Sequence, residues 1–259
     1  MCFSGGRLLF LKKELSSKKF NAVSMKTMNN FRNDFKLITR DEVTGILLFA
    51  PLLMIVVFKL LILFLIPFLQ SKTSFDITPY HGYVVSVLLI LSSGMLGIVT
   101  GFLMIDDRDG SITELMAVTP LGRGGYLFNR LLLIALLSFV YTFLVYVFFA
   151  EILSGFFFVL FLALLQAIYA SIVGLLLFMG AEDKVKGLTY AKALNIMMLF
   201  ALSDLTDMRW LHIVSGFFPT YWFSKMIRSL DYTDMLIGLL VHLLWIVFLS
   251  FRFLKSPSK

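Results

Sequence analysis

The sequence predicts an all-α integral membrane protein that crosses the bilayer as a six-helix bundle. Hydrophobic residues make up 59% of the 259 residues and charged residues only 15%, whereas about a quarter of the residues of a typical soluble domain are charged. The apolar residues gather in long runs between short polar segments, which is the pattern of membrane spans. Basic residues are distributed unevenly between the connections, as in multi-pass proteins.

Six apolar segments are the candidates for these spans. They cover roughly residues 45–69, 82–105, 126–150, 153–180, 188–205 and 235–253. About 20 residues at a rise of 1.5 Å per residue cross the hydrocarbon core, so five of the segments are long enough. The fifth is weaker, because its apolar run covers only residues 193–202 and includes Asn195.

The distribution of Lys and Arg supports six spans with both termini in the cytoplasm. In that arrangement the inner segments carry 18 basic residues and the outer segments carry 4, with Lys59 inside a span. Without the first 24 residues the counts are 13 and 4. Cytoplasmic connections are enriched in Lys and Arg. If the fifth segment did not span, the basic C-terminus would be moved outside, so we expect a multi-pass protein of the cell membrane.

The N-terminal region is expected to lie in the cytoplasm. Residues 1–24 form a basic extension without the features of a cleaved signal peptide, and we expect the native chain to begin at Met25. Residues 25–259 then form a single transmembrane domain. Phe31, Phe35 and Ile38 recur at helical spacing among charged residues. This pattern predicts an amphipathic helix at the membrane surface, although it could also extend the first span.

The inner connection after the second span contains the signals of a short helix. Ser111 followed by Glu114 fits a capping box, in which each side chain binds an amide at the start of the helix. Acidic residues before it suit the positive end of a helix dipole. Pro120 closes the helix, because proline disfavours helical conformation in the residue before it. The alternative is a polar loop whose charges only set topology.

The same connection resembles the signature of ABC-2 type permeases. The run reads Asp107-Arg108-Asp109-Gly110-Ser111-Ile112-Thr113-Glu114-Leu115, then Thr119-Pro120, then Tyr126 with Arg130. The sequence Val118-Thr119-Pro120-Leu121 is most similar to that of the drug-exporter-like branch. Helix count and loop placement extend the similarity over about residues 31–253.

The resemblance implies a set of functional residues and partners. It implies a cytoplasmic coupling helix that docks on separate ABC ATPase subunits through Asp107, Arg108, Gly110, Ser111, Glu114, Leu115 and Pro120. It further implies a second permease copy, identical or homologous, and ATP with Mg²⁺ bound by the partner ATPase. The chain itself is then a transport subunit and not an enzyme.

The outer segment 204–234 is long for a simple connection between helices. It is rich in apolar and aromatic residues, which favour the membrane interface. It resembles the re-entrant helical hairpin of ABC-2 permeases, for which the candidate residues are Phe218, Pro219, Tyr221 and Trp222. Phe218, Tyr221, Trp222 and Met226 form one apolar stripe, with Lys225 and Arg228 facing water. An ordinary aromatic belt is the alternative.

Single polar residues within the spans carry weaker signals. Lys59 near the middle of the first span would be costly unless it meets water or a partner, so it lines the translocation path, extends to the interface, or pairs with Glu151 or Asp76. Ser92, Ser93, Gly94 and Gly97 are expected to let helices approach closely. Gln166 is expected to make an interhelical hydrogen bond.

Other functional classes find little support in the sequence. The chain has no Walker A pattern, so it is not expected to bind ATP. Its single cysteine, Cys2, and its three scattered histidines predict neither a disulfide nor a metal site. Its positive charge follows the membrane topology, so we expect membrane lipid and not nucleic acid as a partner. An ATP-independent secondary transporter and a membrane-embedded enzyme remain alternatives, and amphipathic drugs, lipids and peptides are equally compatible as cargo.

Overall fold

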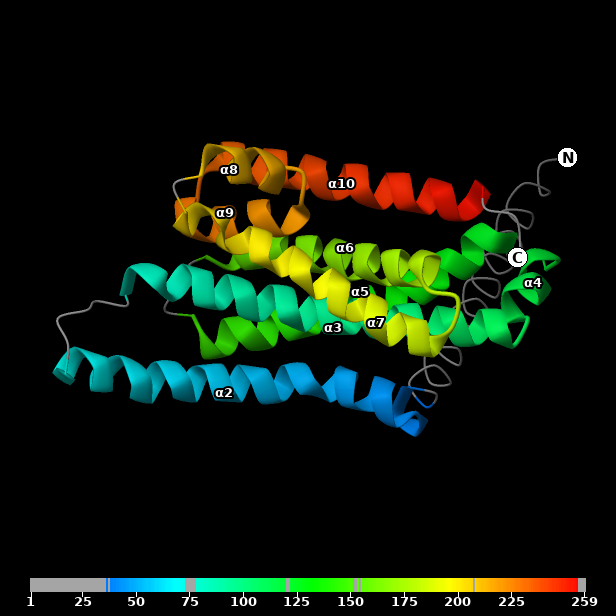
Figure 1. Ribbon diagram of the computed structural model, residues 1–259, viewed down its shortest axis with the longest axis horizontal. Coiled ribbons are helices and arrows are strands. Elements are labelled where there is room, and N and C mark those ends of the chain that lie inside the picture. Colours follow the sequence, from blue (N-terminus) through cyan, green and yellow to red (C-terminus); the bar gives the residue numbers. More distant parts are fainter. Residues whose placement is uncertain are drawn as a thin grey trace, which may run out of the picture. The chain divides into compact units, whose positions relative to one another are not determined.

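The computed structural model describes residues 36, 38–72, 78–119, 122–150, 153, 155–206 and 208–255. Every regular element in these ranges is a helix (Figure 1). By its internal contacts the chain divides into the units Met1–Glu42 and Val43–Lys259. The expected interfacial helix around Phe31 and Phe35 belongs to the first unit and lies mostly outside the described residues, as does the basic N-terminal extension. The following account concerns the second unit.

Within the described ranges six helical segments are long and apolar enough to cross a membrane, which confirms the number expected from the sequence. They are α2 (Glu42–Lys72), α3 (His81–Asp109), α5 (Gly122–Phe148), α6 (Phe156–Gly180), α7 (Lys184–Asn195) continued by the 3₁₀ helix η2 (Ile196–Leu205), and α10 (Tyr232–Lys255). The shorter elements are η1 (Thr78–Tyr80), α4 (Ile112–Ala117), α8 (Arg209–Ser215) and α9 (Pro219–Ser229).

The weak fifth span gains length from an unusual backbone conformation. α7 and η2 together cover Lys184–Leu205, 22 residues, and the ten residues of η2 are in 3₁₀ conformation. A 3₁₀ helix rises about 2.0 Å per residue, against 1.5 Å for an α-helix. The η2 segment therefore reaches about 5 Å further than ten α-helical residues would. This extra reach compensates for the short apolar run seen in the sequence.

α3 is the central helix of the bundle, where it contacts α5, α6, α7 and α9 (Figure 1). Within its most apolar stretch 89% of the residues are buried. Its crossing with α6 depends on two glycines, since a Cβ at Gly97 would lie 2.5 Å from the backbone oxygen of Ala170. A Cβ at Gly174 would lie 3.0 Å from the backbone oxygen of Gly97. Close packing of α3 on α6 is thus possible only with small residues here.

The small residues of α3 differ in what they contact. The hydroxyl of Ser93 donates a hydrogen bond to Oε1 of Gln166 on α6, which confirms the interhelical bond expected for Gln166. The expected close contact at Gly94 is wrong, because a Cβ there would meet no atom within 4 Å. Gly97 faces α6, whereas a side chain at Gly94, three residues earlier, would enter open space.

α2 has few contacts with the other helices of the described structure. Only 17% of its most apolar stretch is buried, although this is also the most apolar of the six spans. One polar contact joins it to α5, where the phenol of Tyr141 donates to the backbone oxygen of Leu48 at 2.7 Å. Most of the α2 surface is therefore left for lipid or for another protein.

Candidate functional site at the end of α3

A buried carboxylate joins the end of α3 to the start of α5. Asp107 is only 3% exposed. The Arg130 guanidinium donates to both of its oxygens, from Nε at 2.5 Å and from Nη2 at 2.7 Å. The phenol of Tyr126 donates to the same carboxylate at 2.8 Å. A bidentate Arg–carboxylate pair is among the strongest polar contacts in proteins, so α3 and α5 are held together at this end.

The neighbouring charged residues tie α3 to the connection between α6 and α7. Arg108 donates from Nη2 to the backbone oxygens of Ala181, at 3.0 Å, and of Glu182. Its guanidinium also lies 5.1 Å from the ring centre of Phe178, within the range of a cation–π contact. Asp106 pairs with Lys184 at 2.9 Å. The last turn of α3 therefore contacts three other helical segments.

α4 is a six-residue helix between α3 and α5, with one side on the bundle and the other exposed. Met116 packs against a core cluster that includes Met104, Tyr126 and Phe253. On the other side Leu115 is 63% exposed, and Val118, the C-cap residue that follows α4, is 85% exposed. Both side chains lie outside the six candidate spans, so the bilayer does not account for their exposure, and they leave a small apolar surface that another protein could cover.

The expected capping box at the start of α4 is wrong. Ser111 has φ 55°, in the left-handed region, and its side chain makes no capping hydrogen bond. The reason is that α3 does not end at Ile105 but continues to Asp109, with the amide of Gly110 bonded to the oxygen of Asp106. The chain must then turn within two residues, and this turn requires a positive φ at Ser111. The acidic residues consequently lie in the last turn of α3 and not at the start of α4.

Substitutions of Ser111 distinguish a capping role from a conformational one. We expect Ser111→Ala to change the free energy of unfolding by less than about 0.5 kcal/mol, since no cap is lost, whereas losing a real N-cap costs about 1 kcal/mol. Ser111→Gly should be at least as stable as the parent, because glycine adopts positive φ without strain. Thermal melting of the purified protein in detergent measures both. A clear loss in Ser111→Ala would restore the capping interpretation.

The structure gathers most of the predicted site residues at one end of the bundle. Asp107 and Arg108 lie in α3, Gly110 and Ser111 form the turn, and Glu114 and Leu115 lie exposed in α4. Pro120 lies outside the described residues. The contact of Asp107 with Tyr126 and Arg130 was not expected from the sequence. The signal was present in the spacing of Tyr126 and Arg130, which places both on one face of a helix.

The predicted outer residues lie at the opposite end of the bundle, beside the start of α10 (Figure 1). Pro219 begins α9, and the indole of Trp222 donates to the backbone oxygen of Gly216 at 2.7 Å. The ring of Phe218 stacks on Phe200 with the centres 4.0 Å apart. Tyr221 is buried, and its ring meets that of Trp222 edge to face with the centres 5.3 Å apart.

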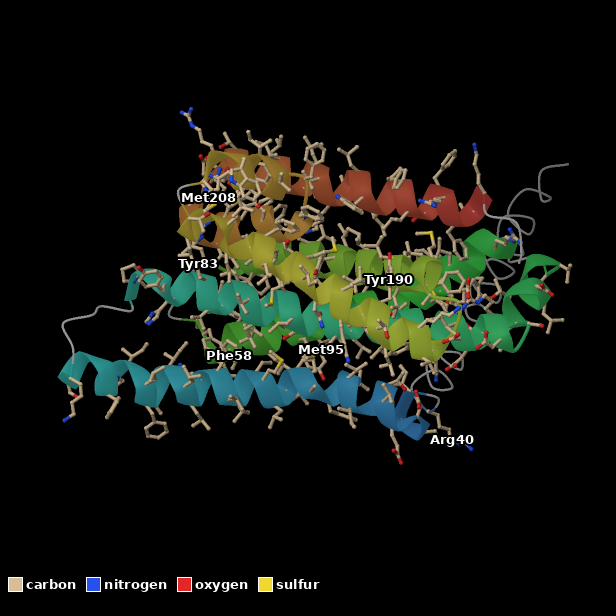
Figure 2. All side chains as sticks on the ribbon, viewed as in Figure 1. Arg40, Phe58, Tyr83, Met95, Tyr190 and Met208 are labelled. Carbon is tan, nitrogen blue, oxygen red and sulfur yellow. The ribbon has the colours of Figure 1, made fainter. Side chains whose placement is uncertain are left out.

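The expected water-facing charges of this outer segment are in fact paired. Lys225 pairs with Asp234 at 3.0 Å, and Arg228 pairs with Asp204. Arg228 also lies over the ring of Tyr83 on α3, 4.1 Å from its centre, and Figure 2 shows Tyr83 at the same end of the bundle as Met208. Two pairs formed with the ends of neighbouring helices explain why these cations do not simply extend into water.

Lys59 lies in the middle of α2, apart from the contacts described at the two ends of the bundle. Its ammonium is 5.5 Å from the ring centre of Phe149, a distance suitable for a cation–π contact. The carboxylates considered as its partners, Glu151 and Asp76, lie outside the described residues. Its place on a translocation path stays a prediction.

Comparison with known proteins agrees with this architecture. A family model described as "Fluoroquinolones export permease protein Rv2686c-like" matches residues 34–250. Two proteins of Mycobacterium tuberculosis, "Fluoroquinolones export permease protein MT2760" of strain CDC 1551 / Oshkosh and "Fluoroquinolones export permease protein Rv2686c" of strain ATCC 25618 / H37Rv, are each 25% identical to this chain over 232 residues. Each alignment covers 85% of this chain and 92% of the relative.

The family match covers all six candidate spans apart from the last turns of α10. It confirms the resemblance to a drug-exporter-like permease and is consistent with the ABC-2 type. The protein is thus a multi-pass membrane protein and a transport subunit. The chain belongs to the Rv2686c-like family of fluoroquinolone export permease proteins.

Proposed function

We propose that this chain is the permease subunit of an ABC-2 type exporter and that separate ATPase subunits dock on α4. The observation that carries the proposal is the two-sided environment of α4. Its outer side exposes Leu115 and Val118, while its inner side packs against the core through Met116. ATP and Mg²⁺ would be bound by the ATPase subunits, and this chain would supply only the transmembrane pathway.

The contacts around Asp107 would carry force from α4 into the bundle. α4 is connected to α3 by two residues and to α5 by a short segment, and the Asp107–Arg130 pair fixes α3 to α5 next to it. A push on α4 would therefore move both helices together. The tight crossing at Gly97 and Gly174 would pass the movement on to α6, because closely packed helices shift as units and deform little.

The orientation proposed for this bundle places the α4 end in the cytoplasm. The support is the excess of Lys and Arg in the segments at that end, which follows the positive-inside pattern. Both termini would then be cytoplasmic, and the connection containing α8 and α9 would face the outside.

We further propose that α8 and α9 form a re-entrant hairpin. The turn between them carries Phe217, whose backbone oxygen accepts a hydrogen bond from the indole of Trp245 at 2.8 Å. Trp245 comes 13 residues after the start of α10 at Tyr232, about 20 Å along the helix axis. The hydrocarbon core is about 30 Å thick, so this contact supports a turn that lies well inside the membrane.

The sparse contacts of α2 support a second permease copy as a partner. A span with so little buried surface can pack against another copy, and Lys59 on α2 could then face a pathway between the two. The names of the relatives refer to fluoroquinolone export. We therefore propose amphipathic aromatic drugs of this kind as the cargo.

Charged substitutions on α4 test the docking proposal. Leu115→Asp combined with Val118→Asp, and separately Glu114→Arg, should leave membrane insertion intact but release the ATPase during co-purification. Loss of an apolar anchor at the centre of an interface often costs 2 kcal/mol, so at least about 30-fold weaker association is expected for the double variant. Met208→Asp, an exposed apolar residue at the opposite end, is the matched control.

Two outcomes would contradict this proposal. One is unchanged co-purification and drug export in the double variant. The other is drug accumulation by vesicles that contain this chain without any ATPase, which would instead support the secondary-transporter alternative.

A further inference from the structure

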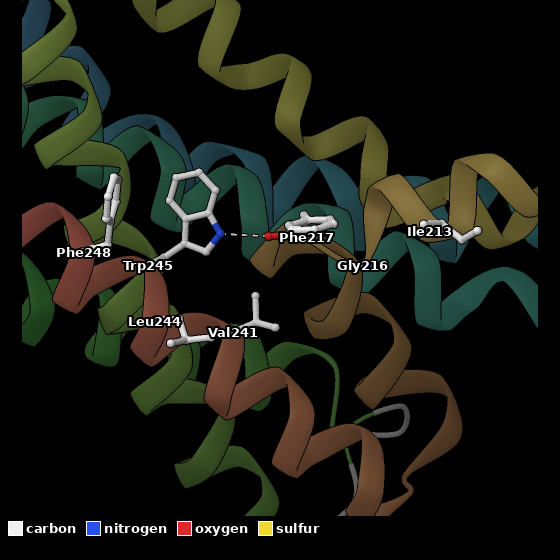
Figure 3. A pocket seen from close by; sticks show the side chains of 7 residues that line it. All are labelled: Ile213, Gly216, Phe217, Val241, Leu244, Trp245 and Phe248. Atoms are coloured by element: carbon white, nitrogen blue, oxygen red, sulfur yellow. Dashed lines mark hydrogen bonds between the residues drawn. The ribbon is translucent and has the colours of Figure 1, made fainter.

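A cavity of about 490 Å³ lies between α8 and α10 (Figure 3). Its walls come from Ile213 on α8, from Gly216 and Phe217 in the turn before α9, and from Val241, Leu244, Trp245 and Phe248 on α10. Figure 3 shows the aromatic rings of Phe217, Trp245 and Phe248 around the same space. The size is that of a site for a small molecule or a lipid chain.

The walls of this cavity offer no free side-chain hydrogen-bond donor to an occupant. The only polar side-chain atom among the lining residues is the indole nitrogen of Trp245, which already donates to the oxygen of Phe217 at 2.8 Å. The oxygen of Gly216 already accepts from Trp222 at 2.7 Å. A charged or strongly polar group placed here would lose its water without gaining a matching donor, which is unfavourable. The lining thus selects hydrocarbon over a drug that carries a carboxylate.

The cavity is accessible from the lipid side of the bundle. Ile213 is 71% exposed and Phe248 is 58% exposed, and α10 is one of the candidate spans. Trp245 lies about 20 Å from the start of α10, within the depth of the acyl chains. Hydrocarbon from the surrounding bilayer can therefore enter without crossing a polar barrier.

A positive charge lies on the same helix face, one turn from the cavity. Arg209 precedes Ile213 by four residues, so the two share a face of α8. Arg209 is exposed and makes no ion pair with any residue in the described part of the chain. Arg209 is the first residue of α8 and follows the end of η2 by four residues. Because η2 ends the fifth span, this places Arg209 at the membrane face where α10 begins.

From this arrangement we propose that the cavity binds an acyl chain of an anionic phospholipid, with the headgroup phosphate against Arg209. The apolar walls accept the chain, and the guanidinium selects a lipid with net negative charge. A molecule of cargo is the alternative occupant, and the experiment below separates the two. The proposal requires the membrane placement of α10 but not the coupling of α4 to an ATPase, so the two proposals fail independently.

Fluorescence quenching of Trp245 by brominated lipid tests the site. The full chain in detergent micelles is titrated with phosphatidylglycerol or phosphatidylcholine brominated in the acyl chain, and the quenching absent from Trp245→Phe is taken as the signal. One cation near an anionic lipid predicts half-maximal quenching by phosphatidylglycerol at an about fivefold lower concentration. Arg209→Gln should make the two curves coincide.

Filling the cavity provides the second arm of the experiment. Val241→Phe should abolish the saturable quenching by either lipid, whereas Leu236→Phe, an exposed position elsewhere on α10, should not change it. Equal titration curves for the two lipids in the parent, or full quenching in Val241→Phe, would overturn the proposal. So would displacement of the brominated lipid by a fluoroquinolone after correction for its absorbance, because the site would then hold cargo.

Discussion

Arg130→Met is expected to lower the free energy of unfolding by about 3–5 kcal/mol, because it leaves the Asp107 carboxylate buried without its cation. Asp107 is 3% exposed, and Tyr126 would remain as the only partner shown for it. One phenol cannot replace a bidentate guanidinium as a source of charge compensation. Thermal melting and denaturant titration of the detergent-purified protein measure the loss, together with the yield of folded protein from the membrane.

Two control variants separate this effect from loss of packing. Replacing both charges in Asp107→Leu/Arg130→Met should recover most of the stability, since two well-packed apolar residues can replace a buried ion pair at little cost. Lys184→Gln removes the cation of the more exposed Asp106–Lys184 pair and should cost less than about 1 kcal/mol. If Arg130→Met melted like the parent, the Asp107–Arg130 pair would not be a main source of stability.

Gly97→Ala is expected to have the second large effect, a destabilisation of at least about 1–3 kcal/mol from overpacking. The new methyl group would lie 2.5 Å from the oxygen of Ala170 and 2.7 Å from Cβ of Val173. A backbone oxygen cannot rotate away as a flexible side chain can, so α3 and α6 must separate along their whole crossing. Melting temperature and resistance to proteolysis in detergent report this change.

Gly94→Ala is the matched control on the same helix, three residues earlier. A Cβ at Gly94 meets no atom within 4 Å, and alanine is a better helix former than glycine. This variant should therefore be as stable as the parent or more stable. Equal losses in the two variants would mean that glycine matters here for helix flexibility and not for close approach.

Five of the six spans could be predicted from the sequence because their apolar runs alone meet the length requirement of the bilayer, and the fifth in chain order because the distribution of Lys and Arg requires it. The end of α3 could not be predicted in the same way. The segment Ser111–Glu114 fits a local capping signal, but the contacts of Asp107 with Arg130 and of Arg108 with Ala181 stabilise four further residues of α3. These partners lie 23 and 73 positions away in the sequence, where no local rule can find them.

The contacts that form the cavity in the outer segment could not be predicted from the sequence either. Its aromatic residues were recognisable as a membrane-interface feature, yet the sequence does not say which indole binds which carbonyl. Trp222 on α9 bonds to Gly216 in the turn before its own helix, while Trp245 bonds to Phe217 in the same turn from α10. The cavity walls are therefore a product of tertiary packing. The pairing of Lys225 and Arg228 with carboxylates was missed for the same reason.

The buried ion pair also bears on how the chain is assembled as it is synthesised. Arg130 follows Asp107 by 23 residues, so at about 5–20 residues per second the two leave the ribosome within roughly 1–5 s of each other. The helical hairpin of α3 and α5 can neutralise its charges at once. Gly97, in contrast, has no packing partner until α6 has been translated. The hairpin of α3 and α5 therefore lies in the membrane with this surface unpacked until α6 inserts.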